Sequence, residues 1–206
     1  MKITKFTHSC LFIEEASQSI LIDPGRYASN DDLPNNIPGL DTILITHKHG
    51  DHLFLPLIKQ LLIQFPHTQI ISNRSVKNLL KKENIFVSLK DTPTIISKTQ
   101  KHAHTFDQEA PDNTCFTITN RLLHPGDSTD FSSVPEILAL PIDGMWQYPT
   151  KTMEQAAILR PNYIIPLHDY RLKDDIRQSV YLRLVNYFKR YDITFFPLEA
   201  GESISL

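Results

Sequence analysis

Cysteine and long apolar runs are scarce in this sequence, and each scarcity excludes a class of protein. Only Cys10 and Cys115 are present among 206 residues, and they form no CxxC pair. A disulfide scaffold is therefore excluded, and a reducing compartment is expected. No apolar stretch approaches the ~20 residues of a membrane-spanning helix, and the N-terminus lacks the apolar segment of a signal peptide. These absences predict a soluble, cytoplasmic protein with no membrane partner.

An excess of charge of either sign is also missing. The chain carries 21 Lys and Arg against 23 Asp and Glu, which gives a formal net charge of −2. Such a balance gives no long-range attraction to nucleic acid, so a nucleic-acid partner is not expected. With 41% hydrophobic residues, the chain is long enough for a core of its own. We expect one domain over residues 1–206.

The pattern of apolar residues predicts a strand-rich start followed by alternating strands and helices. Strands are expected over 1–6, 11–14, 20–22, 42–46, 68–71, 94–97, 115–119, 121–123, 137–142 and 163–167, with short strand-like pieces in 193–206. Helices are expected over 53–65, 75–83, 151–160 and 174–190, and a loop over 27–40. This order predicts one compact α/β unit, and its repetition before and after residue 90 hints at two similar halves.

The stretch ILITHKHGDH gathers four metal-binding side chains within six residues. His47, His49, Asp51 and His52 follow a short buried strand and precede a helix. If the strand continues through them, His47 and His49 project to the same side, because residues two apart share a face. Imidazole suits Zn and Fe, and a carboxylate adds tolerance for Mn. The stretch therefore predicts a metal site on a strand-to-helix turn.

Further candidates lie just beyond other predicted strands. They are His102 and His104 in KHAHTF, His124 and Asp127 in LLHPGDST, and His168 in YIIPLHDY. Each could separately be a capping or surface residue. Sites in α/β sheets form beyond the carboxyl ends of strands, however, so their common position favours a shared site.

The motifs together resemble the metallo-β-lactamase fold superfamily. HxHxDH is its signature, and LIDPG, HPGDS and IPLHD follow the order expected of it. THSC near the start resembles the branch of small metal-dependent hydrolases related to ascorbate-phosphate lactonase. The resemblance spans nearly the whole chain. It implies an α/β fold, an αββα sandwich of two mixed sheets with helices on the outer faces.

The resemblance also implies two metal ions that share one carboxylate. The first ion would be held by His47, His49 and His104. The second would be held by Asp51, His52 and His168, with Asp127 bridging the two ions. For the third ligand of the first ion, KHAHTF offers both His102 and His104. His104 is preferred because the following Thr105 matches the small hydroxyl residue found there in similar proteins.

Three further residues have supporting roles by this resemblance. Asp23 in LIDPG would be the structural aspartate that supports the HxHxDH turn without binding metal. His124 is interpreted as part of the local structure or as support for a ligand. His8 in THSC could face the site as a substrate-binding or supporting group, or could be an ordinary residue at a strand end.

The implied chemistry is hydrolysis. Two divalent ions, with Zn²⁺ preferred and Mn²⁺ or Fe²⁺ as alternatives, would share a hydroxide that attacks an ester, lactone or phosphoester of a small molecule. Asp51 would orient this hydroxide and pass a proton to the leaving group. We therefore expect a zinc-dependent hydrolase with Asp51 as its catalytic residue.

Other functions stay open at this point. The same fold supports phosphodiesterases and nucleases, but this chain shows no insertion for holding nucleic acid. A mono-iron, persulfide-type oxidoreductase would keep the same histidines, whereas the di-iron branch has a Glu in place of His49. A homo-oligomer is also open, because Tyr181, Tyr187 and Phe188 on one predicted helix could serve either an interface or the core.

Overall fold

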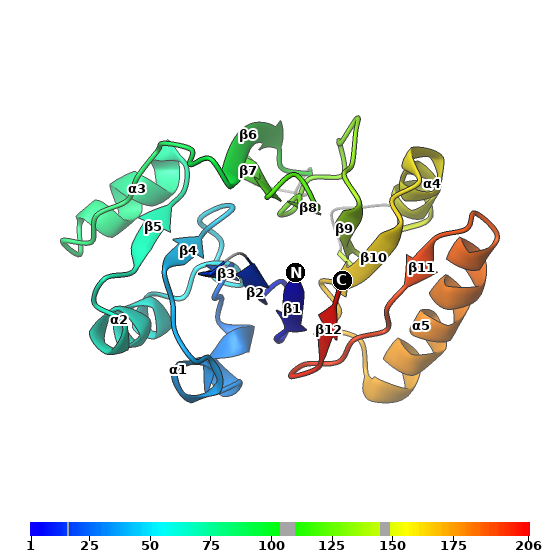
Figure 1. The fold of residues 1–206 in the computed structure, drawn as a ribbon, viewed down its shortest axis with the longest axis horizontal. Coiled ribbons are helices and arrows are strands. Elements are labelled where there is room, and N and C mark those ends of the chain that lie inside the picture. Colours follow the sequence, from blue (N-terminus) through cyan, green and yellow to red (C-terminus); the bar gives the residue numbers. More distant parts are fainter. Residues whose placement is uncertain (16, 104–109, 145–148) are drawn as a thin grey trace. The chain divides into compact units, whose positions relative to one another are not determined.

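The computed structural model describes residues 1–15, 17–103, 110–144 and 149–206. The chain forms two compact units, one made of Met1–Lys90 with Glu199–Leu206 and the other of Asp91–Leu198. Each unit holds a mixed sheet of six strands together with helices (Figure 1). The predicted α/β class with two mixed sheets is therefore confirmed, while a single domain over residues 1–206 stays a prediction.

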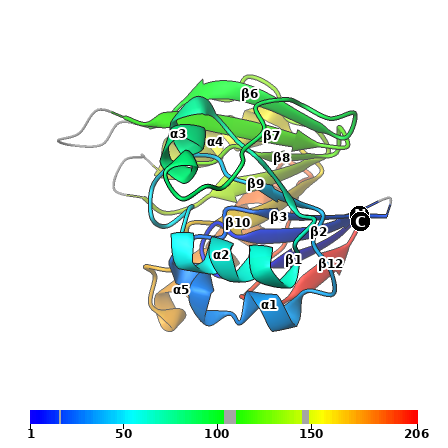
Figure 2. The same ribbon diagram turned by 90° about the vertical axis from the view of Figure 1, so that its left-hand side faces the viewer.

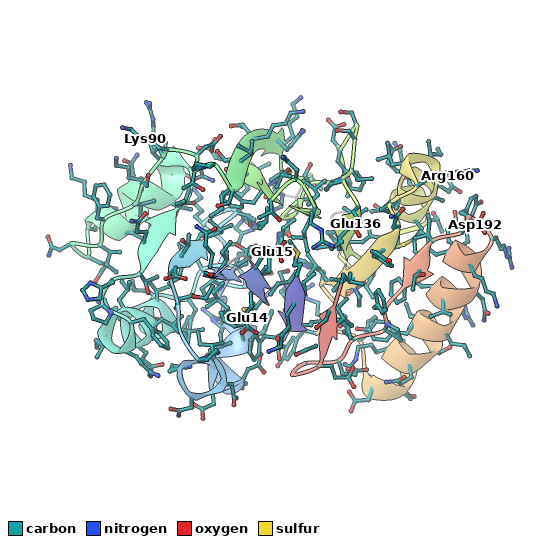
Figure 3. All side chains as sticks on the ribbon, in the orientation of Figure 1. Glu14, Glu15, Lys90, Glu136, Arg160 and Asp192 are labelled. Atoms are coloured by element: carbon teal, nitrogen blue, oxygen red, sulfur yellow. The ribbon has the colours of Figure 1, made fainter. Side chains whose placement is uncertain are left out.

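The first unit contains the sheet β12-β1-β2-β3-β4-β5. Its strands are β1 (Lys2–Lys5), β2 (Leu11–Glu15), β3 (Gln18–Ile22), β4 (Thr42–Leu44), β5 (Gln69–Ile71) and β12 (Ser203–Ser205). The strands from β12 to β3 run antiparallel, and β3, β4 and β5 run parallel. Glu14 and Glu15 at the end of β2 (Figure 3) pair with Lys2 and the Met1 ammonium at 2.6 and 2.9 Å.

The helices of the first unit begin and end close to the predicted positions, with two differences. They are η1 (Tyr27–Asn30), α1 (Leu33–Asn36), α2 (Leu55–Gln64) and α3 (Arg74–Lys81), and α1 contacts α2 (Figure 2). The stretch 27–40, predicted to be a loop, contains both η1 and α1. α3 begins one residue before the predicted start, because Asn73 caps it with a side chain that accepts a hydrogen bond from the Val76 amide at 3.1 Å.

The register of the first sheet explains its core. Phe12, Leu21, Ile43 and Ile70 stand opposite one another on four adjacent strands, so they form one apolar row on one face. The same core contains the buried side chains of α2, which are Leu57, Ile58 and Leu61. This packing fixes β4, and β4 leads directly into the histidine stretch.

The second unit contains the sheet β11-β10-β9-β8-β7-β6. Its strands are β6 (Ile95–Lys101), β7 (Asp112–Ile118), β8 (Leu122–His124), β9 (Ile137–Pro141), β10 (Tyr163–Leu167) and β11 (Thr194–Phe195). β6 and β7 are longer than predicted, by four residues and three residues at one end. These added ends carry polar residues such as Lys98 and Gln100, because a strand of an antiparallel pair needs only one apolar face.

The described residues of the second unit also form two helices, α4 (Pro149–Leu159) and α5 (Asp174–Lys189). Tyr181 and Phe188 of α5 are buried in a core with Leu138 and Ile164 of the sheet. A role in this core therefore accounts for Tyr181 and Phe188, and a homo-oligomer stays a prediction. None of the helices in the described ranges is long and apolar enough to cross a membrane.

Candidate metal centre

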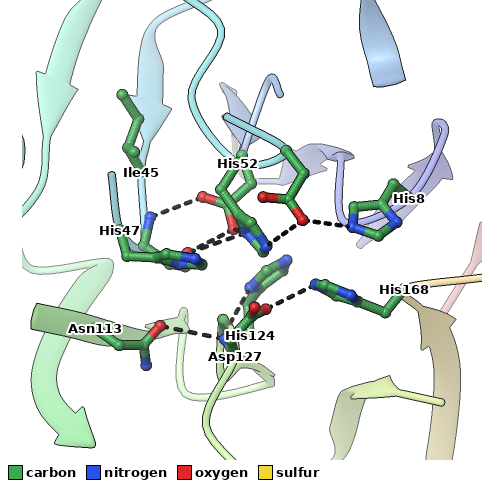
Figure 4. A network of polar contacts seen from close by, with 12 residues as sticks. His8, Ile45, His47, His52, Asn113, His124, Asp127 and His168 are labelled. Carbon is green, nitrogen blue, oxygen red and sulfur yellow. Dashed lines mark hydrogen bonds and ion pairs between the residues drawn. The ribbon is translucent and has the colours of Figure 1, made fainter. Parts of the chain in front are cut away.

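The histidine stretch of the first unit is a loop. β4 ends at Leu44, so the strand does not continue through His47 and His49 as the alternation argument supposed. The imidazoles still lie close together, because the ring centroids of His47 and His52 are 4.0 Å apart (Figure 4). Those of His47 and His49 are 4.7 Å apart. The loop thus brings these three rings together without the help of strand geometry.

Asp23 connects the two ends of this loop. One oxygen of its fully buried carboxylate accepts a hydrogen bond from the Thr46 amide at 2.7 Å. The other oxygen accepts hydrogen bonds from the Thr46 hydroxyl and from His52 Nδ1, both at 2.7 Å. The aspartate of LIDPG therefore ties Thr46, which directly precedes the HxHxDH motif, to His52, which ends it.

Gly25 allows the backbone to approach the same loop closely. A Cβ atom at Gly25 would lie 1.7 Å from the carbonyl oxygen of Asp51, so any larger residue would displace the loop. Hydrogen bonds on either side hold this approach, from the Arg26 amide to Gly50 at 2.8 Å and from the Phe54 amide to Pro24 at 3.1 Å. The motif LIDPG had pointed to Asp23 as a support of this turn, but this role of Gly25 was missed.

A second support comes from the segment that follows β5. The Ser72 hydroxyl donates to the carbonyl of Ile45 at 2.5 Å, and the Asn73 side chain donates to the carbonyl of Thr46 at 2.9 Å. The start of the histidine loop is therefore held from the neighbouring strand. Nothing in the sequence motifs singled out Ser72 or Asn73, since their role depends on the pairing of β4 with β5.

His8 lies against the catalytic candidate Asp51. His8 is buried, and its Nε2 atom is 3.2 Å from Oδ2 of Asp51 (Figure 4). His8 has the unusual φ angle of +71°. The preceding Thr7 is anchored at its amide and hydroxyl by the Asp31 carboxylate, at 2.6 and 2.7 Å. His8 therefore acts on Asp51 from an anchored turn rather than from a strand end.

The first unit by itself offers a donor set that fits divalent metal ions. The ligand atoms of His8, Asp51 and His52 lie within 4.8 Å of one another, and those of His47 and His49 do so as well. Imidazole nitrogens with a carboxylate oxygen suit Zn, Fe and Mn. The side chain of Asp51 is 26% exposed, whereas His47 and His52 are fully buried, so Asp51 is the more accessible of these groups.

The second unit brings together three residues that are far apart in the sequence. Oδ1 of Asp127 lies 2.7 Å from Nε2 of His168 (Figure 4). Its Oδ2 atom lies 3.3 Å from Nε2 of His102. All three side chains are buried. His102 directly follows β6, and His168 directly follows β10 with a φ angle of +63°. Each oxygen of one carboxylate therefore faces a different imidazole.

The HPGD loop that carries Asp127 is held by β7. Asn113 accepts a hydrogen bond from the Asp127 amide at 3.2 Å and donates to the carbonyl of Pro125 at 3.0 Å (Figure 4). The Cys115 thiol donates to the same carbonyl at 3.3 Å, and the Ala103 amide donates to the carbonyl of Asp127 at 3.0 Å. Asn113 escaped the sequence analysis because it lies in the part of β7 that was not predicted.

The remaining predicted residues of the second unit have different positions. His104, the preferred third ligand of the first ion, lies outside the described residues. His102, the alternative, lies against Asp127 as described above. His124 is buried at the end of β8, and its Nδ1 atom accepts a hydrogen bond from the Gly126 amide at 3.3 Å.

A buried pair next to His168 was also missed. Asp169 is buried and accepts a hydrogen bond from the Tyr181 hydroxyl of α5. The same hydroxyl lies 3.1 Å from the carbonyl oxygen of Leu198. The turn that carries His168 is therefore attached to α5, a contact between residues that no local motif connects.

Neither cysteine adds a reactive thiolate. Burial raises the pKa of the Cys115 thiol to about 12. Burial, together with the nearby Asp31 and Asp23 carboxylates, raises the pKa of the Cys10 thiol well above its usual range. Because the thiolate is the form that binds metal or attacks a substrate, both thiols are protonated and inert at neutral pH.

Comparison with known proteins gives consistent matches over most of the chain. A family model described as a beta-lactamase superfamily domain matches residues 2–168. The protein Rv0786c of Mycobacterium tuberculosis is 27% identical over 197 residues, which cover 89% of this chain and 91% of that protein. A UPF0173 metal-dependent hydrolase of Methanosphaera stadtmanae is 28% identical over 217 residues, covering 88% and 89%.

A solved structure shows the same fold. Igni18, a metallo hydrolase from the hyperthermophilic archaeon Ignicoccus hospitalis, has a TM-score of 0.70 with 20% sequence identity. The match covers 98% of this chain and 97% of Igni18.

Proposed function

Because this chain belongs to the metallo-β-lactamase superfamily, we propose that it is a metal-dependent hydrolase that binds two divalent cations. The donor sets of both units support this proposal, since each consists of imidazole and carboxylate groups. Zn²⁺ is the preferred ion for such ligands, with Mn²⁺ or Fe²⁺ as alternatives. We also propose a cytoplasmic location, which the two free, buried cysteines support.

The proposed ligands divide into two sets with one shared member. The first ion is assigned to His47, His49 and His102. The second ion is assigned to Asp51, His52 and His168, with Asp127 shared by both ions. The observation that carries this assignment is the position of Asp127, whose two oxygens face His102 and His168 separately. A carboxylate placed in this way can serve two ions at once. The same contact supports His102 as the third ligand of the first ion.

The proposed reaction is hydrolysis of an ester, lactone or phosphoester of a small molecule. Two divalent ions held by these residues would supply a water that is activated near neutral pH and would polarise the bond to be cleaved. Asp51 is partly exposed and is held by His8, so its carboxylate can orient the attacking water, accept its proton and pass the proton to the leaving group. The negative charge of Asp127 would reduce the repulsion between the two cations.

The test combines elemental analysis with one pair of variants. The wild-type protein should contain about two Zn or Mn ions per chain, as in other two-metal hydrolases. Asp127→Ala should lose metal and reduce hydrolysis of the best substrate in a screen of esters, lactones and phosphodiesters by more than about 100-fold, since even outer partners of ligands are worth about 10–100-fold. Asp130→Ala, which removes an exposed aspartate of the following segment, is the matched control.

Two results would contradict the proposal. Hydrolysis by Asp127→Ala at the wild-type rate would exclude a mechanism that needs a shared carboxylate. A single iron ion per chain would favour an oxidoreductase instead. Circular dichroism of each variant shows whether a loss of activity arises from the site or from unfolding.

A further inference from the structure

The hydroxyl of Thr46 lies close to polar atoms of three other side chains, those of Asp23, His47 and His52. Its Oγ1 atom is 2.7 Å from Oδ2 of Asp23 and 3.0 Å from Nδ1 of His47. A longer distance of 3.4 Å separates it from Nδ1 of His52. These four side chains are fully buried in the first unit, so the directions of their hydrogen bonds are set by one another.

Counting protons fixes these directions. A threonine hydroxyl has one hydrogen to donate, and an ionised carboxylate can only accept. The hydroxyl hydrogen of Thr46 therefore points to Asp23, which leaves the hydroxyl oxygen as an acceptor. The 3.0 Å contact with His47 is then a hydrogen bond in which His47 donates from Nδ1. His52 likewise donates from Nδ1, directly to Asp23 at 2.7 Å.

We propose that Thr46 is a positioning residue that keeps the proton of His47 on Nδ1. Because the Thr46 hydroxyl donates its hydrogen to Asp23, its oxygen can only accept a hydrogen bond from His47. A neutral imidazole with its proton on Nδ1 presents the lone pair of Nε2, the atom that then binds a metal ion. One aspartate thus prepares two histidines, His52 by direct contact and His47 through the Thr46 hydroxyl. The consequence for metal binding rests on the proposed function.

The role of the Thr46 hydroxyl can be tested without changing the backbone contacts that hold the loop. The Thr46 amide donates to the other oxygen of Asp23 at 2.7 Å, and the Thr46 carbonyl accepts from Asn73 at 2.9 Å. Valine at this position keeps both backbone contacts and nearly the same shape but has no hydroxyl. In Thr46→Val, the buried Nδ1 proton of His47 loses its hydrogen bond to the Thr46 hydroxyl, so the proton is expected to move to Nε2 and block that atom.

The experiment measures proton positions and metal affinity separately. Nitrogen-15 NMR of the metal-free protein near pH 8, where an ordinary histidine is neutral, reports which ring nitrogen of His47 and His52 carries the proton. Competition with a chromogenic chelator then gives the affinity for Zn²⁺. Thr46→Val is compared with Thr46→Ser, which keeps the hydroxyl. The matched control is Thr68→Val, because the Thr68 hydroxyl donates to the Leu40 carbonyl at 2.7 Å elsewhere in the same unit.

In the wild type, both His47 and His52 should carry their protons on Nδ1. Thr46→Val should lose this form at His47 while keeping it at His52, and should bind Zn²⁺ about 10–100-fold more weakly at one of two binding steps. Thr46→Ser and Thr68→Val should match the wild type in both measurements.

The inference is overturned if wild-type His47 carries its proton on Nε2, or if Thr46→Val behaves like Thr68→Val. The wild-type spectrum decides the first point even where Thr46→Val does not fold. A wild-type protein that binds no Zn²⁺ would contradict the proposed function, while the metal-free spectrum would still test the role of Thr46.

Discussion

The two units build their candidate ligands in opposite ways. In the first unit, four of them lie within the six residues 47–52, on one loop. In the second unit, His102, Asp127 and His168 come from the ends of three different segments and meet only in the folded unit. The supporting contacts differ as well, because a buried carboxylate, Asp23, holds the first loop and an amide, Asn113, holds the second.

The contacts that hold the ligands in place depend on whether the ligands lie on one loop or at the ends of separate segments. A single loop that carries several ligands needs a partner that holds its ends together, and the Asp23 carboxylate accepts two hydrogen bonds from Thr46 and one from His52. Ligands from separate strand ends are fixed by the sheet itself. For Asp127, the hydrogen bonds of its backbone amide and carbonyl to Asn113 and Ala103 are then enough.

The largest expected effect is on stability, and it differs between the two supporting residues, Asp23 and Asn113. Asp23→Ala leaves two donors of Thr46 and one of His52 without their buried acceptor, and should lower the free energy of unfolding by about 3–5 kcal/mol. Asn113→Ala removes two neutral hydrogen bonds and should cost about 1–3 kcal/mol. Urea unfolding of both variants measures the difference. Equal losses in the free energy of unfolding would show that the Asp23 carboxylate stabilises the first unit no more than the Asn113 amide stabilises the second.

A smaller effect tests the close backbone approach that the first loop requires. Gly25→Ala forces a methyl group against the backbone of Asp51, and such overpacking costs about 1–3 kcal/mol. Gly39→Ala is the matched control, since a Cβ atom there meets nothing within 4 Å. Thermal unfolding and Zn²⁺ binding measure the two variants. If Gly25→Ala kept both the stability and the affinity of Gly39→Ala, the loop would be looser than its contacts indicate.

The smallest effect concerns the one thiol that each unit contains. With a pKa of about 12, the Cys115 thiol is almost entirely protonated at pH 8, and burial protects Cys10 in the same way. Iodoacetamide should therefore leave both cysteines unlabelled in the native protein and label both in urea, as mass spectrometry can show. Labelling of native Cys115 at the rate of a free thiol would contradict its burial under the HPGD loop.

The strength of the sequence prediction varied with the kind of pattern available. β10 spans the predicted residues 163–167, because a strand that is buried on both faces is a continuous apolar run. The ends of β6 and β7 were missed because their residues are mostly polar and form no continuous apolar run, and Asn113 was missed with them. The short helices within 27–40 were missed because their residues favour turns.

The sequence by itself determined the family, the fold class and the histidine stretch, because these depend on local spacing and on the order of motifs. It could predict a shared site for His102, Asp127 and His168, but it could not give the contacts between them. Only the tertiary structure decided that each oxygen of Asp127 faces a different histidine, and that Gly25, Thr46 and Asn113 hold the loops in place. The reason is that such contacts join residues from 14 to 41 positions apart, whose meeting depends on sheet register and packing rather than on neighbouring residues.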